Sequence, residues 1–148
     1  AWREYGLPNG YPVFFFHGGL NSRLFKAAWD DEQRVTEAAG ARVFAIDRPG
    51  YGESDYLPQR TYLSMASDLE ELAQHLGFKR FAVFGYSSGG PNAMACAVKL
   101  PSKVSACGLM SSDGPYKILG MVGRMFENAT PTQEVSAKHA KSLHDTLA

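Results

Sequence analysis

The sequence predicts an α/β fold, in which a parallel sheet is flanked by helices. Two observations support this prediction: short apolar runs alternate along the chain with stretches that have helical signals, and each stretch begins or ends at a residue that favours a helix terminus. Strands that alternate with helices of about ten or more residues require right-handed crossovers, which place the strands parallel and cover both faces of the sheet.

The individual elements follow from local signals. Gly40 is placed to end the first helix and Pro101 to end the third, while Thr61 can cap the second. Within the second helix, apolar residues recur at helical spacing from Met65 to Leu76. The first residues of the chain also look like a strand. The expected order is strand 13–16, helix 25–39, strand 42–46, helix 61–76, strand 81–84, helix 91–100 and strand 104–110.

Composition restricts the function classes. The 148 residues carry 15 acidic and 15 basic side chains, so no net field recruits nucleic acid or an anionic membrane, and the expected partner is a small molecule. The chain has no apolar run near the 18 or so residues of a membrane span, which predicts a soluble protein. Cys96 and Cys107 lie in apolar segments and are expected to be reduced thiols, which favours the cytoplasm.

The pentapeptide Gly85-Tyr86-Ser87-Ser88-Gly89 matches the pattern G-x-S-x-G between an apolar strand and a helix. The pattern alone is weak, but in this setting the serine is forced into a strained turn and its hydroxyl projects from the edge of the sheet. The following helix directs its N-terminal amides toward an oxyanion formed at Ser87. The alternative is a glycine-rich turn without chemistry.

The tripeptide HGG at 17–19 follows the first strand and has no bulky side chain after the histidine. Its backbone N–H groups can therefore face a substrate carbonyl, and each such donor contributes on the order of 3 kcal/mol in the transition state. Gly19 and Ser88 are the expected donors. The alternative is a tight strand exit, and His17 itself is expected to be a structural histidine.

Taken together, HGG at 17–19, DRPGYGES at 47–54 and GYSSGG at 85–90 resemble the α/β-hydrolase superfamily in order and spacing. The resemblance covers roughly residues 5–113. It implies a nucleophile at Ser87, an oxyanion hole from Gly19 and Ser88, and no cofactor or metal. Family members that have an aspartate at the position of the nucleophile are disfavoured, because this sequence has a serine there. The segment DRPGYGES resembles the structural turn of the family.

In this family the catalytic serine is followed along the chain by an acid and then a histidine. Asp113 directly follows the last predicted strand and has two interpretations, the triad acid or a cap for the turn at 114–115. His139 and His144 are the histidines after Ser87, and both lie in a predicted helix. We expect His139 to be packed and His144 to be solvated. The triad histidine is therefore not assigned.

Residues 117–126 and 133–147 have helical patterns and resemble the start of the family's lid. We therefore expect the core to occupy 1–113 and a helical cap to occupy 114–148. We also expect the chain to be incomplete, so that the missing remainder of the same protein supplies the last strands and the histidine.

The favoured function is a serine hydrolase of the esterase or lipase type, which acts through an acyl-enzyme at Ser87. Two alternatives use the same fold: a ligand-binding protein without a triad, and an enzyme with carbon–carbon bond hydrolase or peroxidase-like chemistry. The fold alone does not separate them.

Overall fold

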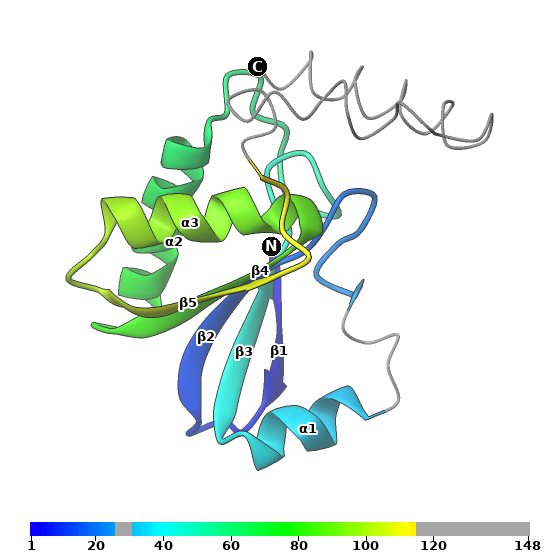
Figure 1. Ribbon diagram of the computed structural model, residues 1–148, viewed down its shortest axis with the longest axis vertical. Helices are drawn as coiled ribbons and strands as arrows, with labels where there is room; N and C mark the ends of the chain where they lie inside the picture. The colour runs from blue at the N-terminus through cyan, green and yellow to red at the C-terminus, as the bar shows by residue number, and fades with distance from the viewer. Residues whose placement is uncertain (26–30, 115–148) are drawn as a thin grey trace. The chain divides into compact units, whose positions relative to one another are not determined.

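The computed structural model describes residues 1–25 and 31–114, and within these the chain forms one five-stranded sheet with helices packed against it (Figure 1). The strand order across the sheet is β1-β3-β2-β4-β5. In chain order the elements are β1 (Trp2–Gly6), β2 (Tyr11–Phe16), α1 (Glu32–Ala38), β3 (Ala41–Ile46), α2 (Tyr62–His75), β4 (Phe81–Tyr86), the 3₁₀ turn η2 (Ser87–Gly89), α3 (Gly90–Lys99) and β5 (Val104–Met110).

The four predicted strands are present and pair in parallel, as expected, and β1 adds an antiparallel strand at one edge of the sheet. The strand β1 pairs with β3 in the antiparallel direction, with Tyr5 opposite Val43. Only four residues separate β1 from β2, and a connection this short can only reverse the chain. At the two ends of this connection, the N–H of Leu7 donates to the carbonyl of Ala41, which starts β3, and the N–H of Tyr11 donates to the carbonyl of Gly40, just before β3.

The core lies on both faces of the sheet because successive side chains of a strand alternate. Phe14 and Phe16 of β2 join the larger cluster, which α2 and α3 cover, whereas Phe15 belongs to a smaller cluster on the opposite face. Figure 1 shows α2 and α3 together and α1 apart from them. The buried members of the larger cluster are Phe14, Phe16, Phe44, Ile46, Met65, Ala66, Leu69, Ala73, Phe81, Val83, Ala93, Cys96 and Leu100.

The second helix forms as its sequence predicts. Thr61 Oγ1 accepts a hydrogen bond from the N–H of Ser64 at 3.0 Å, and Ser64 Oγ accepts one from the N–H of Thr61 at 2.9 Å, which completes a capping box. Met65 and Leu69 are buried against the sheet. Gly77 ends the helix with a φ of +78°, a left-handed conformation that glycine adopts without strain.

Of the other two helices, α1 is shorter than expected, whereas α3 has the predicted length and begins and ends one residue earlier. Helix α1 begins at Glu32, Phe25 lies outside it, and residues 26–30 are not described. The third helix is preceded by the 3₁₀ turn at Ser87–Gly89 and ends at Lys99, before Pro101.

The last strand, β5, is far more exposed than the central strands. It lies at the edge of the sheet, and Leu109 and Met110 are 46% and 38% exposed. Cys107 on this strand is an exposed free thiol, contrary to the packed position expected for it, whereas Cys96 on α3 is buried and free as predicted.

The helices predicted at 117–126 and 133–147, and with them His139 and His144, lie outside the described residues. Across the described ranges, none of the helices is long and apolar enough to cross a membrane.

Candidate active site

The candidate nucleophile lies in the turn between β4 and α3, which we call the elbow (residues 85–90). Ser87 has a φ of +52°, a left-handed conformation that is uncommon for a residue with a Cβ and that marks local strain. Its side chain is half-buried. Among the residues that the structure describes, the Ser87 hydroxyl makes no hydrogen bond.

The elbow requires glycine because its backbone lies very close to neighbouring backbone. A Cβ on Gly89 would lie 2.1 Å from the carbonyl oxygen of Phe16, and a Cβ on Gly85 would lie 2.6 Å from the carbonyl oxygen of Gly89. Real Cβ atoms do not approach this closely, so a side chain at either position would force the strand and helix apart.

The HGG loop (residues 17–19) lies beside the elbow. A Cβ on Gly18 would lie 3.1 Å from Cβ of Ser87, and one on Gly19 would lie 3.6 Å from Oγ of Ser88. The two loops that the sequence assigns to the nucleophile and the oxyanion hole are therefore neighbours in space.

Each predicted oxyanion donor belongs to a peptide unit whose carbonyl is held on the opposite side. The Ser87 carbonyl accepts hydrogen bonds from the N–H groups of Gly90 and Asp113, the latter at 3.1 Å. The N–H of Ser88 shares this trans peptide unit, so it points away from both donors. The Gly18 carbonyl is bound in the same way by His17 and Arg48, which directs the N–H of Gly19 to the other side.

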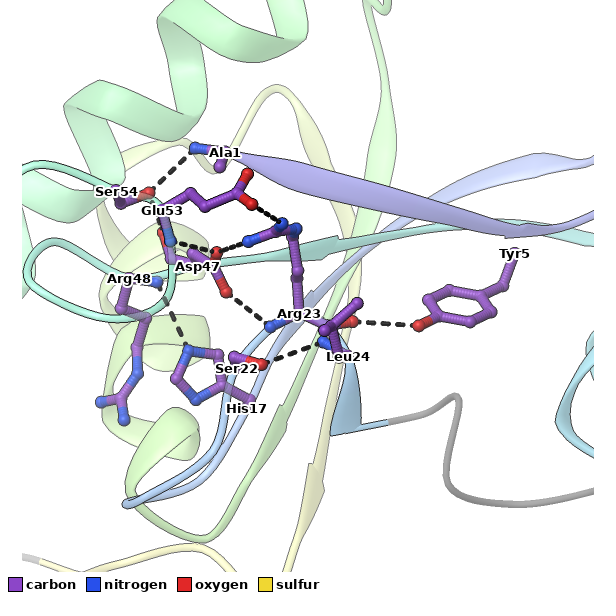
Figure 2. Close-up of polar contacts among 10 residues, drawn as sticks. All are labelled: Ala1, Tyr5, His17, Ser22, Arg23, Leu24, Asp47, Arg48, Glu53 and Ser54. Carbon is purple, nitrogen blue, oxygen red and sulfur yellow. Dashed lines mark hydrogen bonds and ion pairs between the residues drawn. The ribbon is translucent and has the colours of Figure 1, made fainter.

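His17 has a structural role, as its sequence context predicts. The ring is fully buried and packs against the Tyr51 ring in a T-shaped arrangement, with 5.1 Å between ring centroids. Nε2 lies 3.4 Å from the N–H of Arg48, the contact drawn in Figure 2, and Nδ1 lies 2.7 Å from the Gly18 carbonyl. This pattern fits the tautomer in which Nδ1 donates and Nε2 accepts. Both ring nitrogens are therefore engaged and cannot serve Ser87.

Burial lowers the pKa of His17 from 6.5 to about 4, and the positive charge of Arg48 acts in the same direction. The hydrogen bond to Gly18 and the charge of Asp47 raise it, but by less. The ring is therefore neutral at pH 7.

A buried carboxylate organises the turn after β3, which we call the Asp47 turn (residues 47–54). Figure 2 shows the Asp47 carboxylate facing Arg23 and Glu53. It accepts hydrogen bonds from the N–H of Arg23 at 2.6 Å and from the N–H of Glu53 at 2.9 Å, and it pairs with the Arg23 guanidinium. Ser54 Oγ closes the turn by donating to the Asp47 carbonyl at 2.8 Å.

Burial by itself would raise the pKa of Asp47, but the two N–H groups and the Arg23 guanidinium outweigh it and lower the pKa below its ordinary value. The carboxylate is therefore ionised and fully engaged. This is the structural turn that the segment DRPGYGES predicts.

Asp113 lies next to Ser87 through its main chain. Besides the bond from its N–H to the Ser87 carbonyl, its own carbonyl accepts a hydrogen bond from the Ser112 hydroxyl at 2.9 Å. A Cβ on Gly90 would lie 1.8 Å from that hydroxyl, so the segment after β5 crosses the start of α3 directly. The position suits either interpretation of Asp113.

Arg48 and Asn92 contact the elbow in a way that the sequence did not indicate. The Ser88 carbonyl accepts from Arg48 Nη1 at 3.3 Å and from Asn92 Nδ2 at 3.2 Å. The sequence signal for Arg48 is its place in the segment DRPGYGES, two residues after the end of β3, and this signal does not indicate a contact with the elbow. Across residues 1–25 and 31–114, no group of three His, Cys, Asp or Glu side chains could hold a metal ion.

Comparison with known proteins defines the class. A sequence model described as the alpha/beta hydrolase fold matches residues 11–139. The chain is 31% identical over 107 residues to proline iminopeptidase of Arabidopsis thaliana, covering 70% of this chain and 27% of that protein. It is 32% identical over 101 residues to the sn-1-specific diacylglycerol lipase ABHD11 of Danio rerio, covering 67% of this chain and 31% of that protein. The chain belongs to the α/β-hydrolase fold family.

Solved structures agree. A thermophilic esterase from Thermogutta terrifontis superimposes with a TM-score of 0.65 at 28% identity, covering 89% of this chain and 50% of that one. A predicted CIB-like hydrolase from Thermoplasma acidophilum superimposes with a TM-score of 0.68, covering 80% of this chain and 60% of that one. At 19% identity this likeness shows the fold alone. The chain spans about a third or less of the curated relatives described above.

Proposed function

We propose that the protein is a serine hydrolase that cleaves a carboxylic ester or similar small acyl substrate through an acyl-enzyme at Ser87. The single observation that carries this proposal is the strained Ser87, whose hydroxyl has no partner in the described part of the chain and which lies beside the HGG loop. Relatives named as a lipase and an esterase support the choice of an acyl substrate.

In the proposed reaction, Ser87 Oγ attacks the acyl carbon while a base takes its proton. The carbonyl oxygen becomes negatively charged and accepts hydrogen bonds from the N–H groups of Gly19 and Ser88. The tetrahedral intermediate then expels the alcohol, which recovers the proton from the base. Water, activated by the same base, releases the acid and restores the Ser87 hydroxyl.

We assign the triad acid to Asp113, because its main chain already bonds to Ser87 and fixes its distance from the nucleophile. The base comes from outside the described residues. Of the described histidines, His17 has both ring nitrogens engaged and His75 lies in the last turn of α2.

The test is the hydrolysis of p-nitrophenyl acetate by the full-length protein. We expect Ser87→Ala to lower kcat by roughly 10⁴-fold or more, since loss of a catalytic serine leaves only the oxyanion hole and binding. Ser67→Ala, which removes a hydroxyl from α2, is the matched control and should keep wild-type kcat. Equal activity in Ser87→Ala and wild type would overturn the proposal.

A further inference from the structure

Arg48 is a buried cation with no acidic partner in the described ranges. The residue is 7% exposed, and its Nε has no hydrogen-bond partner there. Burial lowers the pKa of its guanidinium, which nevertheless stays charged because arginine does not lose its proton in proteins. A buried charge without a counter-ion is costly, so its retention calls for a specific use.

The two terminal nitrogens of Arg48 join the HGG loop to the elbow. Nη2 donates to the Gly18 carbonyl at 3.0 Å and lies 3.3 Å from Ser88 Oγ, while Nη1 donates to the Ser88 carbonyl at 3.3 Å. The guanidinium carbon lies 4.5 Å from the centre of the Tyr51 ring, which holds the group in place from another side.

The contact with Gly18 determines where the neighbouring N–H points. The Gly18 carbonyl and the Gly19 N–H belong to one planar trans peptide unit and point in opposite directions. Neither Gly18 nor Gly19 has a side chain that would fix this unit by packing, so rotation is opposed mainly by the hydrogen bonds to the carbonyl. In the described residues these bonds come from Arg48 and His17.

We propose that Arg48 is a positioning residue for the oxyanion hole: by holding the Gly18 carbonyl and the Ser88 carbonyl together, it keeps the Gly19 N–H directed toward the oxyanion formed at Ser87. The expected effect on catalysis rests on the proposed function. The expected effect on the orientation of the peptide unit does not. Arginine suits the task because its planar fork reaches several acceptors at once, whereas a lysine ammonium is a single point.

The experiment compares Arg48→Met and Arg48→Lys with the matched control Arg60→Met in the full-length protein. Arg60 also lies over the Tyr51 ring, at 5.4 Å, but its guanidinium bonds to the Pro49 carbonyl. The first readout is the carbonyl ¹³C shift of Gly18 and the amide shift of Gly19. The second is kcat and KM for p-nitrophenyl acetate, normalised to the folded fraction.

We expect Arg48→Met to move both shifts and to lower kcat by about 10- to 100-fold with KM nearly unchanged, because the loss of one oxyanion donor costs at most about 10²- to 10³-fold. Arg48→Lys should recover part of kcat, and Arg60→Met should match the wild type. If Arg48→Met does not fold, the shifts in Arg48→Lys carry the test.

Unchanged Gly18 and Gly19 shifts, or a kcat per folded molecule equal to that of the wild type, would overturn the inference. If the wild type itself neither turns over the ester nor reacts at Ser87, the proposed function fails. The two shifts would then still report whether Arg48 holds the peptide unit.

Discussion

The Asp47 turn and the elbow end β3 and β4, the two strands that flank β2, yet they are built in opposite ways. The Asp47 turn is held by polar side chains that satisfy one another, above all a carboxylate with three partners. The elbow depends on close backbone contacts that only glycine permits at positions 85 and 89. Within the described residues, the hydroxyl of Ser87 makes no hydrogen bond. A turn organised by a fully hydrogen-bonded carboxylate fits a structural role, whereas a strained serine with an unused hydroxyl fits the role that we propose for Ser87.

The largest expected effect is on activity and concerns Asp113, whose main chain bonds to the elbow. If Asp113 is the triad acid, Asp113→Asn should lower kcat by about 10⁴-fold, as loss of the acid misorients the histidine. The main-chain N–H that bonds to Ser87 is kept in this variant. A kcat within about threefold of the wild type would contradict the assignment of Asp113 as the triad acid.

At the Asp47 turn, the large effect should instead be on stability. Asp47→Asn removes the charge from a buried pair and should lower the free energy of unfolding by about 3 to 5 kcal/mol, measured with urea. Glu53→Gln is the matched control, because Glu53 pairs with the same Arg23 but its side chain is 73% exposed, so it should cost about 1 kcal/mol or less. Equal losses in the two variants would show that burial of the carboxylate is not what matters.

His17 links the two regions and should make stability depend on pH. Because its pKa is about 4 in the folded protein and 6.5 for the free side chain, the unfolded chain binds the extra proton between these values. The stabilisation is complete above pH 6.5 and is lost as the pH falls toward 4, by about 3 kcal/mol in total.

The measurement is urea unfolding of wild type and His17→Gln between pH 7 and pH 4, and the variant should lack most of this slope. Asp47 also loses stability at the acidic end of this range, because its carboxylate is protonated more readily in the unfolded chain than in the folded protein. Both proteins carry Asp47, so this contribution is common to the two profiles and cancels in their difference. Parallel pH profiles for the two proteins would contradict the buried neutral histidine.

A smaller effect is expected from added volume at the elbow. Gly89→Val should lower the free energy of unfolding by about 1 to 3 kcal/mol, because the new side chain meets the carbonyl oxygen of Phe16. Gly19→Ala is the stability control, since its Cβ would make only ordinary contact with Ser88 Oγ. An unchanged urea midpoint for Gly89→Val would show that close approach is not the reason for the glycine.

Much of the fold could be predicted because it depends on local signals. The capping box at Thr61 and the stripe from Met65 to Leu69 specify α2, and four apolar runs specify the parallel strands. The antiparallel direction of β1 was not predicted, because it depends on a four-residue connection and on the pairing of β1 with β3. The exposure of Cys107 was missed because an apolar run does not reveal that its strand lies at an edge.

The same distinction holds for the candidate site. The spacing of HGG and GYSSGG predicts two glycine-rich loops, and the structure places them side by side. The contacts of Arg48 with Gly18 and Ser88 join residues 30 and 40 positions apart, and no sequence pattern encodes them. Long-range contacts of this kind depend on the assembled sheet.

The most direct test of the difference between the two turns is covalent labelling of the full-length protein with a fluorophosphonate, followed by intact-mass analysis. An activated serine reacts with this probe, whereas hydroxyls bound within a structural turn, such as that of Ser54, do not. We predict a single adduct on the wild type that Ser87→Ala abolishes and Ser54→Ala keeps. An adduct that persists in folded Ser87→Ala, or a folded wild type that gains none, would contradict the assignment of Ser87 as the nucleophile.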